Sequence, residues 1–215
     1  MDRCGCGDDF ASIFDRATAE SDRDRYRRHG PDGSTRLLID MLLRAGVRGA
    51  SLLDVGGGIG VIAHELLREG AGRAVLVDAA PAYLEVARQE ARVSNLLERV
   101  EFVDGDFVRR AGAIDAADIV TLDRVICCYP DAEALVSMSA ARARRLYGLV
   151  LPRDAWYVRL AIRLNNLRFR IARRAYRSFA HPNGLVDGLV AAAGLRPIGE
   201  RRTLFWRVVL YERAA

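Results

Sequence analysis

The chain has 215 residues, a formal net charge of +5 and 51% hydrophobic residues. This composition favours a folded protein, because disordered chains combine lower hydrophobicity with a larger net charge. No apolar run approaches the roughly 20 residues of a membrane span, and the first ten residues lack the apolar segment of a secretory signal. We therefore expect one cytoplasmic domain.

The charge is distributed unevenly along the chain. All 33 basic residues are arginines, a bias that indicates genome composition more than nucleic-acid binding. Residues 142–177 hold eleven arginines and one acid, Asp154, a balance of +10 that leaves −5 for the rest. The cysteines lack the CxxC spacing of zinc sites, so we expect no structural metal; they are Cys4, Cys6, Cys127 and Cys128.

An N-terminal helical arm is predicted over residues 1–46. Sparse apolar positions among polar residues predict an amphipathic helix over 9–29, before a Gly-Pro-Asp-Gly turn. Ser34 is the expected N-cap of a second helix, which stops at Gly46.

From residue 51 on, short apolar runs alternate with helical patterns. Strands are predicted over 52–55, 74–77, 100–103, 119–122 and 146–151, and helices over 61–69, 81–93, 132–144 and 185–193. Two closing runs, 196–203 and 205–212, can pair as a hairpin. These elements predict an α/β fold: a doubly wound, Rossmann-like seven-stranded sheet, mostly parallel with an antiparallel C-terminal hairpin. Residues 51–151 form the expected cofactor-binding core, 152–180 a basic helical insertion, and 181–215 the final helix and hairpin.

A glycine-rich turn links the first strand to its helix. Its residues are Asp54-Val-Gly56-Gly57-Gly58-Ile-Gly60. Glycines let the backbone approach a ligand closely, and the following helix offers free N–H groups. Nicotinamide and flavin enzymes use similar loops, so this turn alone does not separate them from methyltransferases.

Acidic residues also end the next three strands. Asp78 ends the second, where an acid can accept ribose hydroxyls or simply cap a strand. Asp106 and Phe107 follow an Asp-Gly pair after the third, which can also be a plain turn. Asp123 ends the fourth and leads into Arg-Val-Ile-Cys-Cys-Tyr-Pro130.

With all four motifs in this order, residues 52–131 resemble the core of class I S-adenosylmethionine-dependent methyltransferases. The fourth motif is similar to that of enzymes that methylate quinone rings. The flanks are similar to the magnesium-protoporphyrin O-methyltransferase family at Tyr26-Arg-Arg-His-Gly30, Thr35, Arg174-Ala-Tyr176, His181, Ala193-Gly194-Leu195 and Phe205. Where that family carries a histidine before the Tyr-Pro of the fourth motif, this chain has Cys128.

The resemblance implies S-adenosylmethionine as cofactor and an acceptor oxygen on a conjugated apolar molecule, such as a porphyrin carboxylate or a quinone-type phenol. A carboxylate needs no base, whereas a phenol benefits from one, and the candidates are His181, Tyr26 and Tyr129. His181 can equally be a structural residue before Pro182. The implied cofactor residues are Asp54, Gly56, Gly57, Gly58, Gly60, Asp78, Ala79, Asp106, Phe107 and Asp123.

The basic segment reads as one amphipathic helix over 154–177. Its expected apolar face consists of Tyr157, Leu160, Ala161, Leu164, Ile171 and Ala175, and its basic face of Arg159, Arg163, Arg170, Arg174 and Arg177. A solvated arginine face explains this pattern, and so does a mobile lid over a large acceptor or a peripheral contact with a membrane.

Two other function classes remain open. A nicotinamide-dependent oxidoreductase uses the same fold, but the hydride-site Tyr-Lys pair needs a lysine, which this chain lacks. A nucleic-acid methyltransferase accounts for the arginines, but its Asn/Asp-Pro-Pro-Tyr motif is replaced here by Leu122-Asp-Arg-Val-Ile. We expect a small-molecule acceptor and no nucleic acid.

Overall fold

The structure is a computed structural model that describes residues 13–174 and 176–214. Cys4, Cys6, Ala175 and the predicted helix start at residue 9 lie outside the described residues. Within them, α2 (Arg16–His29) precedes α3 (Gly33–Ala45). The cap of α3 is Asp32, whose side chain accepts the Thr35 N–H, so the prediction of Ser34 as the cap is wrong. A carboxylate two residues earlier takes that place, and Ser34 instead donates its hydroxyl to Asp32.

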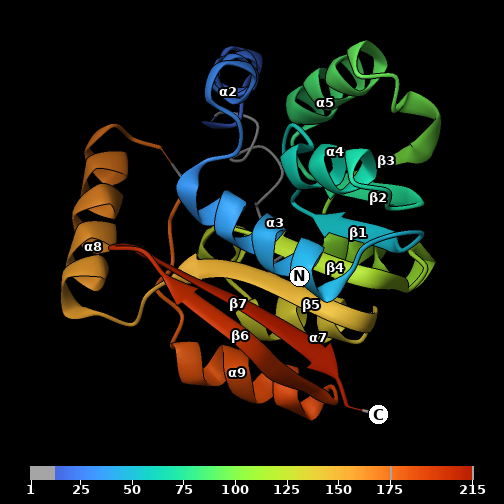
Figure 1. Ribbon diagram of the computed structural model, residues 1–215. Coiled ribbons are helices and arrows are strands. Elements are labelled where there is room, and N and C mark those ends of the chain that lie inside the picture. Colours follow the sequence, from blue (N-terminus) through green and yellow to red (C-terminus); the bar gives the residue numbers. More distant parts are fainter. Residues whose placement is uncertain (1–12, 175, 215) are drawn as a thin grey trace.

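All seven predicted strands form one sheet in the order β3-β2-β1-β4-β5-β7-β6 (Figure 1). The first five are parallel, and β7 pairs antiparallel with both β5 and β6. Helices cover both faces of the central strands, so these strands are short continuous apolar runs, which is why the sequence predicts them well. The strands are β1 (Ser51–Val55), β2 (Arg73–Asp78), β3 (Val100–Asp104), β4 (Ala117–Asp123), β5 (Ala143–Pro152), β6 (Leu195–Arg202) and β7 (Trp206–Arg213).

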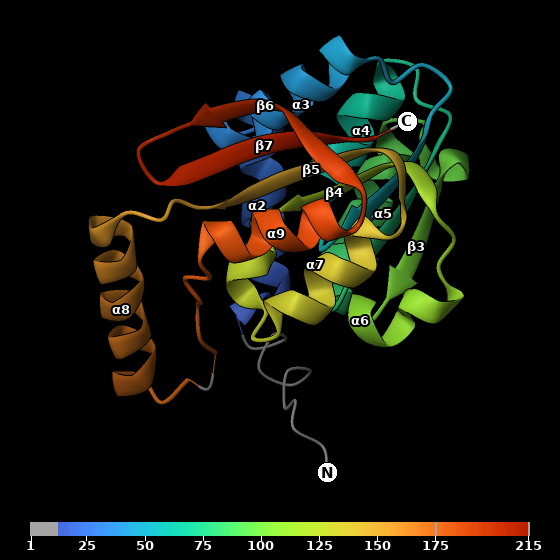
Figure 2. The same cartoon turned by 90° about the horizontal axis from the view of Figure 1, so that it is seen from below.

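Helices cover both faces of the sheet, and each face has its own core (Figure 2). On one face α3, α4 (Val61–Arg68) and α5 (Pro81–Val93) bury apolar residues against the strands. On the other face lie α6 (Phe107–Arg110), α7 (Ala132–Ala140) and α9 (Asn183–Ala192). Short 3-10 turns complete the layers at Leu97–Arg99, Ala111–Ala113 and Ile126–Cys128.

One predicted helix ends early. The helix expected over 132–144 stops at Ala140, and β5 already begins at Ala143, which pairs with Ala117 of β4. Alanine and arginine favour a helix locally, but pairing with the central strand overrides that preference.

The basic helix α8 (Trp156–Ile171) lies between β5 and α9 and is shorter than predicted. It ends because Arg173 has a φ of +53°, and residues 176–182 have no regular secondary structure. Its predicted apolar face is not buried: Leu160 and Leu164 are exposed, whereas Val158 and Ile162 are buried. Within the described residues, no helix is both long enough and apolar enough to cross a membrane.

Candidate functional site

A cavity of about 770 Å³ lies at the carboxyl ends of the parallel strands. The strand order reverses between β1 and β4, and ligands of doubly wound sheets bind at such a switch point. Because β1, β2 and β4 run in the same direction, their terminal acids reach the same edge of the sheet. Asp54, Asp78 and Asp123 all line the cavity.

The turn between β1 and α4 forms one wall of the cavity. Gly56 and Gly58 have φ values of +63° and +58°, which side chains rarely adopt, and Gly56 donates its N–H to the Val77 carbonyl at 2.7 Å. Gly57 lines the cavity as well. Gly60 does not: it is the N-cap of α4, and a Cβ there would lie 3.1 Å from Leu76.

Asp54 is buried at the end of β1, 1% exposed. One carboxylate oxygen accepts the Thr121 hydroxyl at 2.7 Å, and the other, Oδ2, has no partner among the described residues. Burial, together with the charges of Asp123 and Asp78, raises the pKa of Asp54 to about 7. A buried carboxylate oxygen that lacks a donor fits a ligand that carries a positive charge.

Asp78 organises the edge between β2 and α5. Its two oxygens accept the N–H groups of Gly58 and Ala80, each at 2.8 Å, and burial raises its pKa. Each carboxylate oxygen has lone pairs left for a further donor, such as a ribose hydroxyl. Ala79, next to it, also lines the cavity.

Asp106 and Phe107 begin α6 at the cavity wall. The Asp106 carboxylate caps α6 by accepting the Val108 N–H at 2.8 Å, and it also accepts the Tyr129 hydroxyl at 2.9 Å. Phe107 is buried but has atoms at the cavity surface. An apolar ring and an acid therefore stand where the resemblance implies adenine contacts.

Asp123 belongs to a network that the sequence does not predict. Its carboxylate accepts the Thr35 hydroxyl at 2.5 Å and pairs with Arg124 at 3.1 Å. Arg124 has a φ of +61° and also pairs with Asp32, the cap of α3. The network fixes an arginine at the cavity wall. The family resemblance had singled out Thr35, but no pattern in the sequence indicated that its partner is Asp123, 88 positions away.

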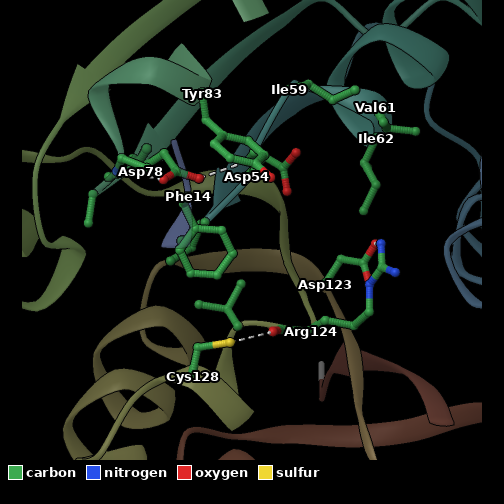
Figure 3. A pocket seen from close by; sticks show the side chains of 18 of the residues that line it. Phe14, Asp54, Ile59, Val61, Ile62, Asp78, Tyr83, Asp123, Arg124 and Cys128 are labelled. Atoms are coloured by element: carbon green, nitrogen blue, oxygen red, sulfur yellow. Dashed lines mark hydrogen bonds and ion pairs between the residues drawn. The ribbon is translucent and has the colours of Figure 1, made fainter. Parts of the chain in front are cut away.

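An aromatic wall, also missed by the sequence, consists of Phe14, Tyr83 and Tyr176, all at the cavity surface. The Phe14 ring centroid lies 5.7 Å from Tyr83 and 5.9 Å from Tyr176, both edge to face. Phe169 of α8 extends the row, 5.2 Å from Tyr176. Figure 3 shows Phe14 between Tyr83 and Cys128. The Tyr176 hydroxyl donates to the Cys128 sulfur at 3.0 Å.

The three predicted bases have different positions. The Tyr26 hydroxyl contacts Glu65 at 2.5 Å and Arg68 at 2.7 Å, and burial raises its pKa well above the usual range. The His181 ring bonds the Tyr129 carbonyl at 2.9 Å, stacks on Phe179, and does not line the cavity. His181 therefore lies outside the cavity, whereas Tyr26 and Tyr129 both line it. The Tyr26 hydroxyl is held by Glu65 and Arg68, and the Tyr129 hydroxyl by Asp106.

Comparison with known proteins finds similarity to methyltransferases. Residues 52–146 match a family model described as a methyltransferase domain. A curated relative, the ribosomal protein L11 methyltransferase of Deinococcus radiodurans, is 33% identical over 76 residues. That match spans 35% of this chain and only 28% of the relative.

Two solved structures share the fold over nearly the whole chain. Magnesium protoporphyrin IX methyltransferase of Synechocystis PCC 6803, with bound S-adenosylhomocysteine, has a TM-score of 0.71 at 18% identity, covering 94% of this chain and 99% of that one. An O-methyltransferase family protein of Burkholderia thailandensis has a TM-score of 0.73 at 20% identity, covering 96% and 63%. Together with the glycines and acids at the ends of β1 and β2, these matches identify residues 52–146 as a methyltransferase domain.

Proposed function

We propose that the protein transfers the methyl group of S-adenosylmethionine to an oxygen of a flat, conjugated, apolar acceptor, either a porphyrin carboxylate or a quinone-type phenol. The cofactor, when bound, supplies an electrophilic methyl group on a sulfonium. Asp54, Asp78 and the turn at Gly56–Gly58 are the residues expected to hold it, since all of them line the cavity and Oδ2 of Asp54 has no donor among the described residues.

The observation that carries the proposal is the aromatic wall, which lines the same cavity as these residues. Phe14 and Tyr176 present rings to the same cavity as the carboxylates, and aromatic rings pack favourably on flat conjugated molecules. Arginines stand around the same cavity and suit an acidic acceptor; they are Arg25, Arg109, Arg110 and Arg124. The names of the two structural relatives, a porphyrin methyltransferase and an O-methyltransferase family protein, agree with this class of acceptor.

Methyl transfer requires the protein mainly to hold the acceptor oxygen and the methyl group in position. A carboxylate acceptor would only have to be held in line with the methyl group, because it is already ionised and no proton has to be removed. A phenol must also lose a proton, and of the predicted bases the proposal keeps Tyr129. Its hydroxyl would take that proton while it passes its own proton to the Asp106 carboxylate, to which it donates at 2.9 Å at the cavity.

The test is a transfer assay with the methyl-labelled cofactor and four acceptor classes: magnesium protoporphyrin, a hydroxylated quinone, ribosomal RNA and ribosomal protein. We expect label in the porphyrin or the quinone. Mild alkali then separates the two, because a methyl ester is hydrolysed and a methyl ether is not. Label confined to RNA or protein would contradict the proposal.

A variant of the wall sharpens this test. Phe14→Leu keeps an apolar side chain but removes the ring, so the acceptor KM should rise several-fold while the reaction itself continues. Phe179→Leu is the matched control, because that ring stacks on His181 and does not line the cavity. Equal KM values in the two variants would show that the aromatic wall does not bind the acceptor.

A further inference from the structure

The helix α8 turns an apolar surface away from the protein. Its outward residues are 45–76% exposed and lie within about 80° of one another at 3.6 residues per turn. The buried residues Val158 and Ile162 lie on the opposite side. The exposed set, called here the outer stripe, is Trp156, Leu160, Leu164, Leu167 and Ile171.

Arginines border the outer stripe on both sides. At the same helical spacing Arg159, Arg163 and Arg170 fall on one border and Arg168 on the other, and all four are exposed. The sequence of α8 contains no aspartate or glutamate. An apolar centre between two basic borders is the pattern of a helix that lies flat in a membrane interface.

One further exposed apolar side chain, outside α8, adjoins the outer stripe. Leu204, at the turn between β6 and β7, is 80% exposed, and the Tyr157 hydroxyl of α8 donates to its carbonyl at 2.8 Å. Figures 1 and 2 both show α8 at the periphery, apart from the layers that cover the sheet. The stripe and the turn can therefore meet one flat surface together.

The inner side of α8 leads to the cavity. Asn166 pairs with the backbone of Ser178 through two hydrogen bonds of 2.7 and 2.8 Å, and Phe169 contacts Tyr176. Tyr176 and Ser178 both line the cavity. One helix thus has a side that faces outward and a side joined to the cavity wall.

We propose that the outer stripe, with Leu204, binds the surface of a bilayer that contains anionic lipids. The apolar side chains would enter the acyl boundary while the arginines contact the headgroup phosphates. A second copy of the chain fits this surface poorly, because two α8 helices in contact would bring their arginine borders together with no acid on either helix.

Flotation with vesicles tests this without any acceptor, so it is independent of the proposed reaction. The purified chain should float with phosphatidylcholine vesicles that contain phosphatidylglycerol, bind pure phosphatidylcholine at least tenfold more weakly, and dissociate as salt is raised. Tryptophan emission should shift to shorter wavelength and be quenched by brominated lipid, and both changes should be lost in Trp156→Phe, in which Trp206 is the one tryptophan left.

Two triple variants have matched controls. Arg163→Gln with Arg168→Gln and Arg170→Gln should weaken binding at least tenfold, whereas Arg44→Gln with Arg73→Gln and Arg92→Gln removes the same charge from exposed sites elsewhere and should not. Leu160→Asn with Leu164→Asn and Ile171→Asn should also weaken it.

The control for the triple variant at Leu160, Leu164 and Ile171 is Val93→Asn with Met138→Asn and Ile198→Asn, three exposed apolar sites outside α8. Cofactor affinity should be unchanged in all four variants, which verifies their folding. Equal binding to neutral and anionic vesicles, equal losses in variants and controls, or an α8-dependent dimer that ignores vesicles would each overturn the proposal.

Discussion

At the scale of single residues, Asp54 combines burial, an unpaired oxygen and a pKa raised to about 7. A cationic ligand binds its charged form, and binding must release a proton wherever the free carboxyl is protonated. Cofactor affinity should therefore rise with pH up to about 7, by as much as about tenfold per pH unit, and level off above it. Calorimetry from pH 5.5 to 8.5 measures this.

The variant Asp54→Asn keeps the bond to Thr121 but cannot ionise, so its affinity should be low and independent of pH. Asp118→Asn is the matched control, since Asp118 also accepts a hydroxyl, that of Ser51, but lies outside the cavity. A wild-type affinity that is flat with pH would show that Asp54 does not carry the recognition of charge.

His64 provides a second pH effect, on stability. It is fully buried, neither ring nitrogen has a partner among the described residues, and burial lowers its pKa to about 4. Below pH 6.5 His64 binds a proton in the unfolded chain, but in the folded chain it stays neutral until about pH 4. The free energy of unfolding therefore falls over this window as the pH falls. The loss amounts to about 3 kcal/mol at most.

Urea unfolding of the wild type and of His64→Met at pH 7.5, 6, 5 and 4.5 isolates this contribution. The difference in unfolding free energy between the two should change steadily in favour of the variant as pH falls. Parallel curves would mean that His64 is protonated within the folded protein.

At the scale of residues, the sequence predicts which side chains reach the cavity where their position is set locally, and their contacts with the cofactor stay predictions. Asp54, Asp78, Asp106, Phe107 and Asp123 all reach the cavity because each follows the carboxyl end of a parallel strand or its turn. Gly60 and His181 do not reach it. Gly60 is turned away because it is the N-cap of α4, and His181 because its ring bonds the Tyr129 carbonyl. Neither position can be predicted from the spacing of residues along the chain.

At the scale of elements, the turn after β1 can be tested through its backbone. Gly58 and Gly49 both have positive φ, +58° and +72°, and in neither case would an added Cβ meet another atom closer than 3.5 Å. Gly58→Ala and Gly49→Ala should each cost about 1 kcal/mol of stability from backbone strain alone.

The two variants should differ in cofactor binding, because Gly58 lines the cavity and Gly49 does not. We expect about a tenfold loss of S-adenosylmethionine affinity in Gly58→Ala by calorimetry and none in Gly49→Ala. Equal affinities in both variants would place the cofactor away from the turn.

Strands were predicted better than helix ends. Buried strands are read directly from short apolar runs, whereas α7 ends where strand pairing begins and α8 ends at the left-handed Arg173. The face of α8 was predicted wrongly for a further reason. Hydrophobicity alone assigns Leu160, Leu164 and Ile171 to the interior, but the protein offers that side of the helix nothing to pack on.

At the scale of the whole molecule, the cavity joins parts of the chain that are far apart. Phe14 precedes α2, Tyr176 follows α8, and both meet at the edge of a sheet that begins at residue 51. The side of this cavity that we propose for the cofactor was predictable because it comes from one continuous stretch, 52–131. The acceptor side was not, because only tertiary contacts such as Phe14 with Tyr176 bring its residues together.

A crystal structure with bound S-adenosylhomocysteine tests most directly whether cofactor and acceptor occupy opposite sides of this one cavity. We expect the ribose hydroxyls at Asp78, the amino group close to Asp54 and the Gly56–Gly58 turn, and the sulfur open toward Phe14 and Tyr176. A ligand bound elsewhere, or one whose sulfur faces away from the aromatic wall, would contradict the assignment of the acceptor site.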